Sequence, residues 1–127
     1  MTIPVLTIDG PSGSGKGTVA AIIAKKLGWQ ILDSGALYRL AALTVTRNNI
    51  NLEDIQLLTE AIAKMSVNFA DGKVWLDDED VSLTIRTEEA GNNASKVAAI
   101  GEVRQTLLQW QRDFAKAPGL VADGRDM

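Results

Sequence analysis

The stretch that decides the fold is Gly10-Pro11-Ser12-Gly13-Ser14-Gly15-Lys16-Gly17-Thr18. An apolar run at residues 3–8 precedes it, and apolar residues at helical spacing follow it. A glycine-rich loop between a strand and a helix lets backbone N–H groups approach an anion, and the lysine adds a positive charge. This order of strand, loop and helix predicts a site for the phosphates of a nucleoside triphosphate.

One position departs from the strict phosphate-loop pattern. Gly17 follows Lys16 where that pattern has Ser or Thr, and Thr18 places a hydroxyl one residue later. Direct ligation of Mg²⁺ by a loop side chain is therefore left open. The alternative interpretation is a Gly/Ser turn that only links strand to helix, and Lys16 and the flanking elements argue against it.

Composition narrows the class of protein. With 46% hydrophobic and 5% aromatic residues, 127 residues suffice for one domain with an aliphatic core, or for part of a larger one. A net charge of −3 argues against a general binder of nucleic acid or anionic membranes. The chain has no cysteine and no histidine, so its chemistry must use carboxylates, Lys, Arg or a metal. No signal segment or membrane span is predicted, and the expected location is cytoplasmic.

Apolar patterning predicts alternating strands and helices. Continuous apolar runs at residues 3–8, 29–32 and 120–122 suit the strands of a buried parallel sheet. Val19, Ile22, Ile23 and Leu27 recur at helical spacing and predict the first helix, which is expected to stop at Gly28. The second is expected to end near residues 48–49, and the third to be capped by Asn51, with Asp54 in its first turn.

The pattern changes after residue 65. Apolar alternation at 67–69 and 74–76 flanks Asp71-Gly72 and predicts a hairpin. Residues 77–80 are expected to form a polar turn and residues 81–85 a third strand. Helical pattern resumes near Thr87. A later amphipathic helix is marked by Val103, Leu107, Trp110 and Phe114.

Together these patterns predict the α/β class: a P-loop three-layer fold with a parallel central sheet and a small antiparallel insert near residues 66–86. The predicted organisation is a P-loop core (1–34), a region carrying the insert (35–115) and a return to the core sheet (116–127). Ligands of such sheets bind beyond the carboxyl ends of the strands, where Asp9, Asp33-Ser34 and residues 123–126 fall. Because a core strand normally has more structure after it, we expect the C-terminal part of the fold to be absent.

The chain resembles the bacterial cytidylate kinases, a family of nucleoside monophosphate kinases. The phosphate loop alone is shared by many kinases. Its combination with Asp33-Ser34-Gly35-Ala36-Leu37-Tyr38-Arg39 and Asp123-Gly124-Arg125-Asp126-Met127 is far more specific, and Gly17-Thr18 also fits this family. Shorter matching segments lie at residues 85–87, 94–98 and 103–104.

This resemblance implies transfer of the γ-phosphoryl group of ATP to CMP or dCMP, with Mg²⁺, and makes residues 35–115 the monophosphate-binding region. It implies catalytic roles for Lys16 at the transferred group and for Arg39 and Arg125 as a clamp on the monophosphate. Asp123 is implied to hold Mg²⁺ through a water molecule. The implied ATP-binding residues are Gly10, Pro11, Ser12, Gly13, Ser14, Gly15, Lys16, Gly17 and Thr18, and the implied substrate-binding residues are Ser34, Arg39, Ser95, Arg104, Arg125 and Asp126.

Ser95, Arg104 and Asp126 are implied to read the cytosine edge, with Asp126 accepting from the amino group and the other two donating. The resemblance also implies a monomer when complete, with small-molecule partners and neither nucleic acid nor membrane. Residues 1–127 alone are expected to be inactive because the family's lid lies beyond Met127. Two alternatives stay open: a kinase for a different monophosphate, and a nucleotide-binding module without turnover.

Overall fold

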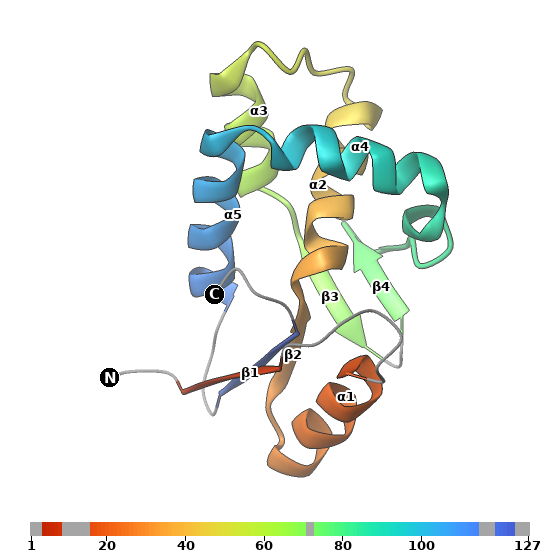
Figure 1. Cartoon of the computed structure of the whole chain (residues 1–127), viewed down its shortest axis with the longest axis vertical. Coiled ribbons are helices and arrows are strands. Elements are labelled where there is room, and N and C mark those ends of the chain that lie inside the picture. Colours follow the sequence, from red (N-terminus) through yellow and green to blue (C-terminus); the bar gives the residue numbers. More distant parts are fainter. Residues whose placement is uncertain (1–3, 9–15, 71–72, 115–118, 124–127) are drawn as a thin grey trace. The chain divides into compact units, whose positions relative to one another are not determined.

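A computed structural model describes residues 4–8, 16–70, 73–114 and 119–123 of the chain (Figure 1). The chain divides into two compact units. The first comprises Met1–Gly35 and Leu108–Met127, and the second comprises Ala36–Leu107.

The first unit holds a parallel sheet of β1 (Val5–Ile8), β2 (Gln30–Asp33) and β6 (Leu120–Asp123), in the order β1-β6-β2. The register pairs Ile8 with Asp123 on one side of β6, and Asp33 with Asp123 on the other. Because all three strands run the same way, their carboxyl ends share one edge of the sheet. The predicted parallel sheet is confirmed.

Helix α1 (Lys16–Leu27) packs through small side chains. Ala20 and Ala24 are buried in a cluster with Val121 of β6, which brings the helix close to the sheet. Of the four apolar residues whose spacing predicted this helix, Ile23 joins the cluster. Val19, Ile22 and Leu27 are 48%, 50% and 47% exposed.

Glycines shape two turns of the first unit. Gly28 follows α1 with φ +68°, a left-handed conformation that ends the helix as predicted. Gly119 precedes β6 and is buried; a Cβ there would lie 2.5 Å from ring carbons of Trp29. Its carbonyl also accepts a hydrogen bond from the Gln30 amide at 3.1 Å. Trp29 can occupy its site only because residue 119 has no side chain.

The second unit begins within α2 (Ser34–Arg47), whose face bearing Leu37, Leu40 and Ala41 is fully buried. Helix α3 (Ile55–Ala63) buries Leu58 and Ile62.

The predicted cap of α3 was wrong. Asp54 caps the helix by accepting from the Leu57 amide at 3.2 Å. The Asn51 side chain instead accepts a hydrogen bond from the Glu53 amide, in a local turn that precedes the helix.

A separate antiparallel sheet orders β3 (Val67–Ala70), β4 (Lys73–Leu76) and β5 (Glu79–Asp80) as β3-β4-β5. This confirms the predicted insert, but the third strand was expected at residues 81–85. Asp77 and Asp78 both have positive φ, at 50° and 68°, as a two-residue hairpin turn requires. The turn uses only these two residues, so pairing resumes at once with Leu76 opposite Glu79.

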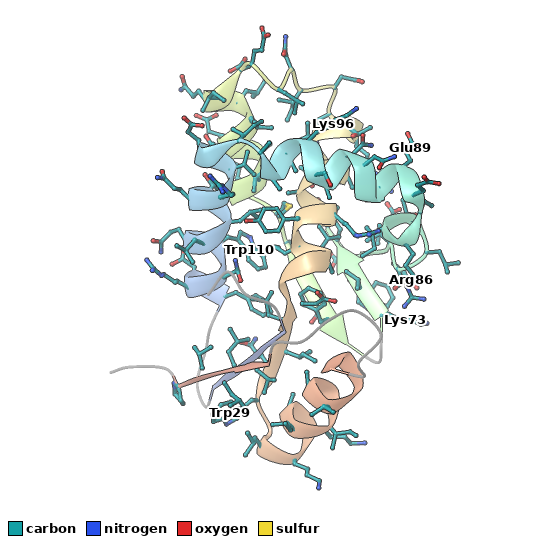
Figure 2. The ribbon with its side chains drawn as sticks, in the orientation of Figure 1. Trp29, Lys73, Arg86, Glu89, Lys96 and Trp110 are labelled. Carbon is teal, nitrogen blue, oxygen red and sulfur yellow. The ribbon has the colours of Figure 1, made fainter. Side chains whose placement is uncertain are left out.

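Ser82 extends this sheet through its side chain. Its buried hydroxyl accepts from the Val74 amide at 2.8 Å and donates to the Asp80 carboxylate at 2.6 Å. The hydroxyl and amide of Ser82 lower the pKa of Asp80, with smaller contributions from Lys73 and Arg86, which Figure 2 labels. A short 3-10 helix, η1 (Thr84–Arg86), follows.

Two helices complete the order: α4 (Glu88–Ala98) and α5 (Gly101–Phe114). Thr87 caps α4 by accepting from the Ala90 amide. Along α5 the fully buried residues are Val103, Leu107 and Gln111. Trp110 is only half-buried and stacks on Phe114 with centroids 5.1 Å apart, so the buried face is rotated from the predicted one.

Within the four described ranges, no helix combines the length and apolar character needed to cross a membrane.

Candidate functional site

The first part of the candidate site is the carboxyl edge of the parallel sheet. β1 ends at Ile8, just before the glycine-rich loop, and α1 begins at Lys16, just after it. At the end of β2, α2 begins directly at Ser34. Neither helix carries an acidic residue in its first turn, but Asp33 directly precedes α2. The partial positive charge at the start of α1 favours an anion.

Several predicted site residues lie outside the described part of the chain: Gly10, Pro11, Ser12, Gly13, Ser14, Gly15, Arg125 and Asp126. The backbone is described for Lys16, Gly17 and Thr18 in the first turn of α1, for Ser34 at the start of α2 and for Asp123 at the end of β6. For these five residues, the structure describes the backbone and not the side chain.

Asp33 and Asp123 are the last residues of the adjacent strands β2 and β6 at this edge. Mg²⁺ in phosphate-binding sites keeps several waters and needs only one or two carboxylates from the protein. Two aspartates on adjacent strand ends fit that donor set. Among the described residues, no group of three or more His, Cys, Asp or Glu is placed to hold a metal ion.

A separate candidate site, within the second unit, is centred on Arg39 of α2. Its Nη1 donates to the carbonyl oxygen of Ile85 at 2.6 Å and more weakly to that of Thr87 at 3.5 Å. Within the described part of the chain, Nε and Nη2 have no hydrogen-bond partner. These two nitrogens form the side of the guanidinium that can bind an anion with two parallel hydrogen bonds.

Helix α4 lies against Arg39 at Gly91, where a Cβ atom would be 3.1 Å from Nη2. Ser95 follows one turn later on the same helix face and donates its hydroxyl to the Gly91 carbonyl at 3.2 Å. The structure therefore brings two predicted substrate residues, Arg39 and Ser95, to one stretch of α4. The contributions of Gly91 and of the two carbonyls were missed, because nothing in the sequence marks which backbone groups meet Arg39.

Arg104 and Arg86 differ from Arg39 in their surroundings. Arg104 is exposed on α5, and no ion pair or hydrogen bond to another described residue holds its head group. Arg86 makes no ion pair with the neighbouring Glu88 or Glu89 in the described structure and lies near Asp80 instead.

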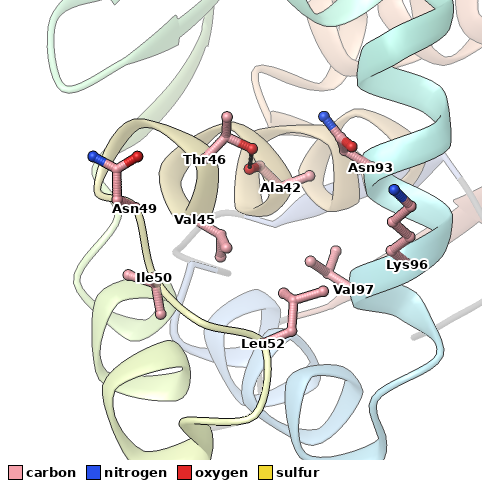
Figure 3. A pocket seen from close by; sticks show the side chains of 9 residues that line it. All are labelled: Ala42, Val45, Thr46, Asn49, Ile50, Leu52, Asn93, Lys96 and Val97. Atoms are coloured by element: carbon pink, nitrogen blue, oxygen red, sulfur yellow. Dashed lines mark hydrogen bonds between the residues drawn. The ribbon is translucent and has the colours of Figure 1, made fainter.

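A cavity of about 300 Å³ lies elsewhere in the second unit (Figure 3). Its wall is apolar at Val45, Ile50 and Val97, with Thr46, Asn93 and Lys96 among its polar members. None of the predicted site residues lines it. The cavity is therefore separate from the cluster around Arg39.

The parallel sheet of the first unit, together with the phosphate-loop sequence between β1 and α1, defines a P-loop nucleotide-binding protein of the α/β class. The family model described as cytidylate kinase matches residues 6–127, and the chain belongs to the cytidylate kinase family.

Curated relatives agree with this assignment. The chain is 58% identical to a cytidylate kinase of Chromobacterium violaceum over 127 residues, which is all of this chain and 57% of the relative. It is 57% identical over 129 residues to a cytidylate kinase of Marinomonas sp. and 52% identical over 130 residues to one of Shewanella pealeana. These alignments cover 98% of this chain and 57% and 56% of the relatives. The chain thus spans about half the length of the curated relatives it matches.

Proposed function

We propose that the protein containing this chain transfers the γ-phosphoryl group of ATP to CMP or dCMP, producing ADP and CDP or dCDP. Membership of the cytidylate kinase family supports this activity. The single observation that carries it is the placement of Arg39, whose Nη1 donates to the Ile85 carbonyl while Nε and Nη2 have no hydrogen-bond partner among the described residues. A guanidinium held by one nitrogen offers an oriented pair of donors to a phosphate.

The neighbours of Arg39 support a nucleotide as the ligand. Ser95 lies four residues after Gly91, which corresponds to roughly 6 Å along a helix. With the monophosphate at Arg39, the base would extend along α4 toward Ser95. We propose that Ser95, Arg104 and Asp126 then read the cytosine edge. Because the Ser95 hydroxyl donates to Gly91, it must rotate away before it can donate to a base.

The chemistry requires positioning and charge neutralisation rather than a nucleophilic side chain. An oxygen of the CMP phosphate attacks the γ-phosphorus, the bond from that phosphorus to the β–γ bridging oxygen breaks, and ADP leaves. We propose that Lys16 and the backbone of residues 10–18 hold the triphosphate, with Arg39 and Arg125 on the monophosphate. When bound, Mg²⁺ offsets charge on the triphosphate oxygens, and Asp123 with Asp33 beside it would hold the water shell of the ion.

Other properties of the whole protein are part of the same proposal. A net charge of −3 does not favour binding to polyanions, and family membership favours small-molecule substrates. We propose a cytoplasmic monomer without nucleic-acid or membrane partners. Size-exclusion chromatography with light scattering would contradict the monomer by showing a dimer mass.

The experiment that tests the activity is a substrate panel with the full-length protein, ATP and Mg²⁺. CMP and dCMP are expected to be phosphorylated with kcat/KM at least about a hundredfold above UMP and AMP, as for a site that pairs its buried polar groups with one base. Preference for AMP or another acceptor would replace the cytosine assignment. Nucleotide binding without ADP production would support a binding module instead.

A further inference from the structure

We propose that Gly91 is a positioning residue for Arg39, and that its lack of a side chain sets which edge of the guanidinium meets the monophosphate. The inference rests on the proposed function, in which Arg39 binds that phosphate. In this role Gly91 contacts neither the attacking phosphate oxygen nor the γ-phosphorus, and acts only through Arg39.

The first observation is the anchoring of Nη1. This nitrogen is bound at 2.6 Å to the Ile85 carbonyl, and the Thr87 carbonyl lies 3.5 Å away. The guanidinium is rigid and planar, so fixing Nη1 restricts the whole group. The Nε–Nη2 edge is then the one left for a bidentate contact with phosphate oxygens.

The second observation is the space beside Nη2. A Cβ at residue 91 would lie 3.1 Å from Nη2, 3.5 Å from Cζ and 3.7 Å from Nη1. Non-bonded carbon is at its optimum near 3.5–4.0 Å, so the contact with Nη2 would be too close. The guanidinium would have to shift, and a rigid group that shifts by a few tenths of an ångström also disturbs its bond to Ile85.

The third observation is that glycine is a poor choice for the helix itself. Gly91 lies inside α4, and its φ is not positive, so the backbone does not require glycine. Alanine at such a position ordinarily stabilises a helix. The steric demand of Arg39 is therefore the structural reason for glycine at this place.

The test compares Gly91→Ala with a matched control, Asn92→Ala, in the full-length enzyme. Asn92 is exposed on the same helix, so its replacement also raises helix propensity without approaching Arg39. We expect Gly91→Ala to raise KM for CMP at least about tenfold, the factor lost with one well-oriented charged hydrogen bond. KM for ATP should stay unchanged, and Tm should equal or exceed that of the wild type. Asn92→Ala should leave both KM values unchanged.

A second arm repeats Gly91→Ala in an Arg39→Lys background. Lysine keeps the charge but has no Nη2, so the added methyl should cause no further rise in KM for CMP. An equal rise in both backgrounds, a rise in KM for ATP, or a drop in Tm would overturn the positioning role.

The two proposals fail separately. If Arg39→Ala leaves KM for CMP unchanged, Arg39 does not bind the monophosphate and that part of the proposed function is wrong. If Arg39→Ala raises it and Gly91→Ala does not, the clamp stands and the role of Gly91 is wrong.

Discussion

Asp33 and Asp123 are register partners on the neighbouring parallel strands β2 and β6. Both are the last residues of their strands, and Ile8, the last residue of β1, pairs with Asp123 from the other side. Two aspartates and Ile8 therefore meet at one edge of the sheet from three distant parts of the sequence. In the proposed function, these aspartates would hold the water shell of a cation beside the bound phosphates.

Asp123→Asn should lower kcat in the full-length enzyme by about tenfold to a hundredfold, as expected for a residue that orients a metal-bound water. The Mg²⁺ concentration for half-maximal rate should rise, because an amide attracts the ion less than a carboxylate. Steady-state kinetics over a Mg²⁺ titration measures both. Asp78→Asn, in the exposed β4–β5 turn, is the control. An unchanged Mg²⁺ dependence would contradict the assignment.

Lys16→Ala should lower kcat by about a thousandfold, since its charge is used mainly as the phosphoryl group transfers. CMP affinity, measured by calorimetry, should stay near wild type because the proposed role of the lysine is on the triphosphate and not on CMP. Lys25→Ala in the last turn of α1 tests the effect of losing a charge elsewhere on the helix. Near-normal turnover in Lys16→Ala would show that the loop is not the catalytic phosphate site.

Asp126→Asn should reduce the preference for CMP over UMP. A carboxylate only accepts hydrogen bonds, whereas an amide can also donate to the uracil carbonyl. The ratio of kcat/KM values should fall by about one to two powers of ten, mainly through lost efficiency with CMP. Asp113→Asn, exposed on α5, is the matched control. Equal losses with both substrates would assign Asp126 to the phosphate clamp or to the fold.

Ser82→Ala should destabilise the antiparallel sheet by about 1–2 kcal/mol, because the Val74 amide loses its acceptor. Chemical denaturation of the full-length protein measures the change in free energy of unfolding. Ser66→Ala is the control, since Ser66 is exposed and only its backbone groups take part in the sheet contacts with Asp77. Equal stability of the two variants would show that water replaces the serine hydroxyl.

Glu79→Gln should cause a small, pH-dependent loss of stability. The two hydrogen bonds from Arg47, at 2.8 and 3.1 Å, hold the pKa of Glu79 below its ordinary 4.5. A lowered pKa in the folded state means stabilisation that is present above the unfolded pKa and disappears as pH falls through the folded value. The Tm of Glu79→Gln should therefore lie below that of the wild type at pH 7, and this difference should disappear between about pH 5 and pH 3.

Both side chains of this pair are exposed, at 40% and 57%, so the gap at pH 7 should be only slight. Glu53→Gln provides the unpaired reference. A gap that widened toward low pH would contradict the sign of the shift.

Local sequence patterns predicted much of the fold because strand, helix and turn preferences depend on residues that are close in the sequence. A continuous apolar run before the glycine-rich loop predicted β1 and the parallel sheet, and period-two alternation around Asp71-Gly72 predicted the hairpin of β3 and β4. Gly28 ended α1 because only a residue tolerant of φ +68° suits that place. The predictions of the α3 cap at Asn51 and of a third strand at residues 81–85 missed the observed positions by a few residues. Neighbouring polar residues at both places could equally well have formed the cap or the turn.

Which side chains of a helix are buried against distant elements was decided by the tertiary structure. The apolar residues of α1 did not reveal that Ala20 and Ala24 would face Val121, since the closest approach favours the smallest side chains. The heptad-like pattern of α5 did not reveal that Gln111 would be buried and Trp110 only half-buried.

The sequence by itself determined the family, the P-loop class and the residues expected to meet the nucleotide, because these depend on residue types at fixed spacing. Only the tertiary structure decided which nitrogen of Arg39 is bound by Ile85 and why residue 91 has no side chain beside it. Residues 39, 85 and 91 belong to three different elements, and no local propensity links them. Their arrangement exists only once α2, η1 and α4 have packed, since a guanidinium takes its direction from the carbonyls that surround it.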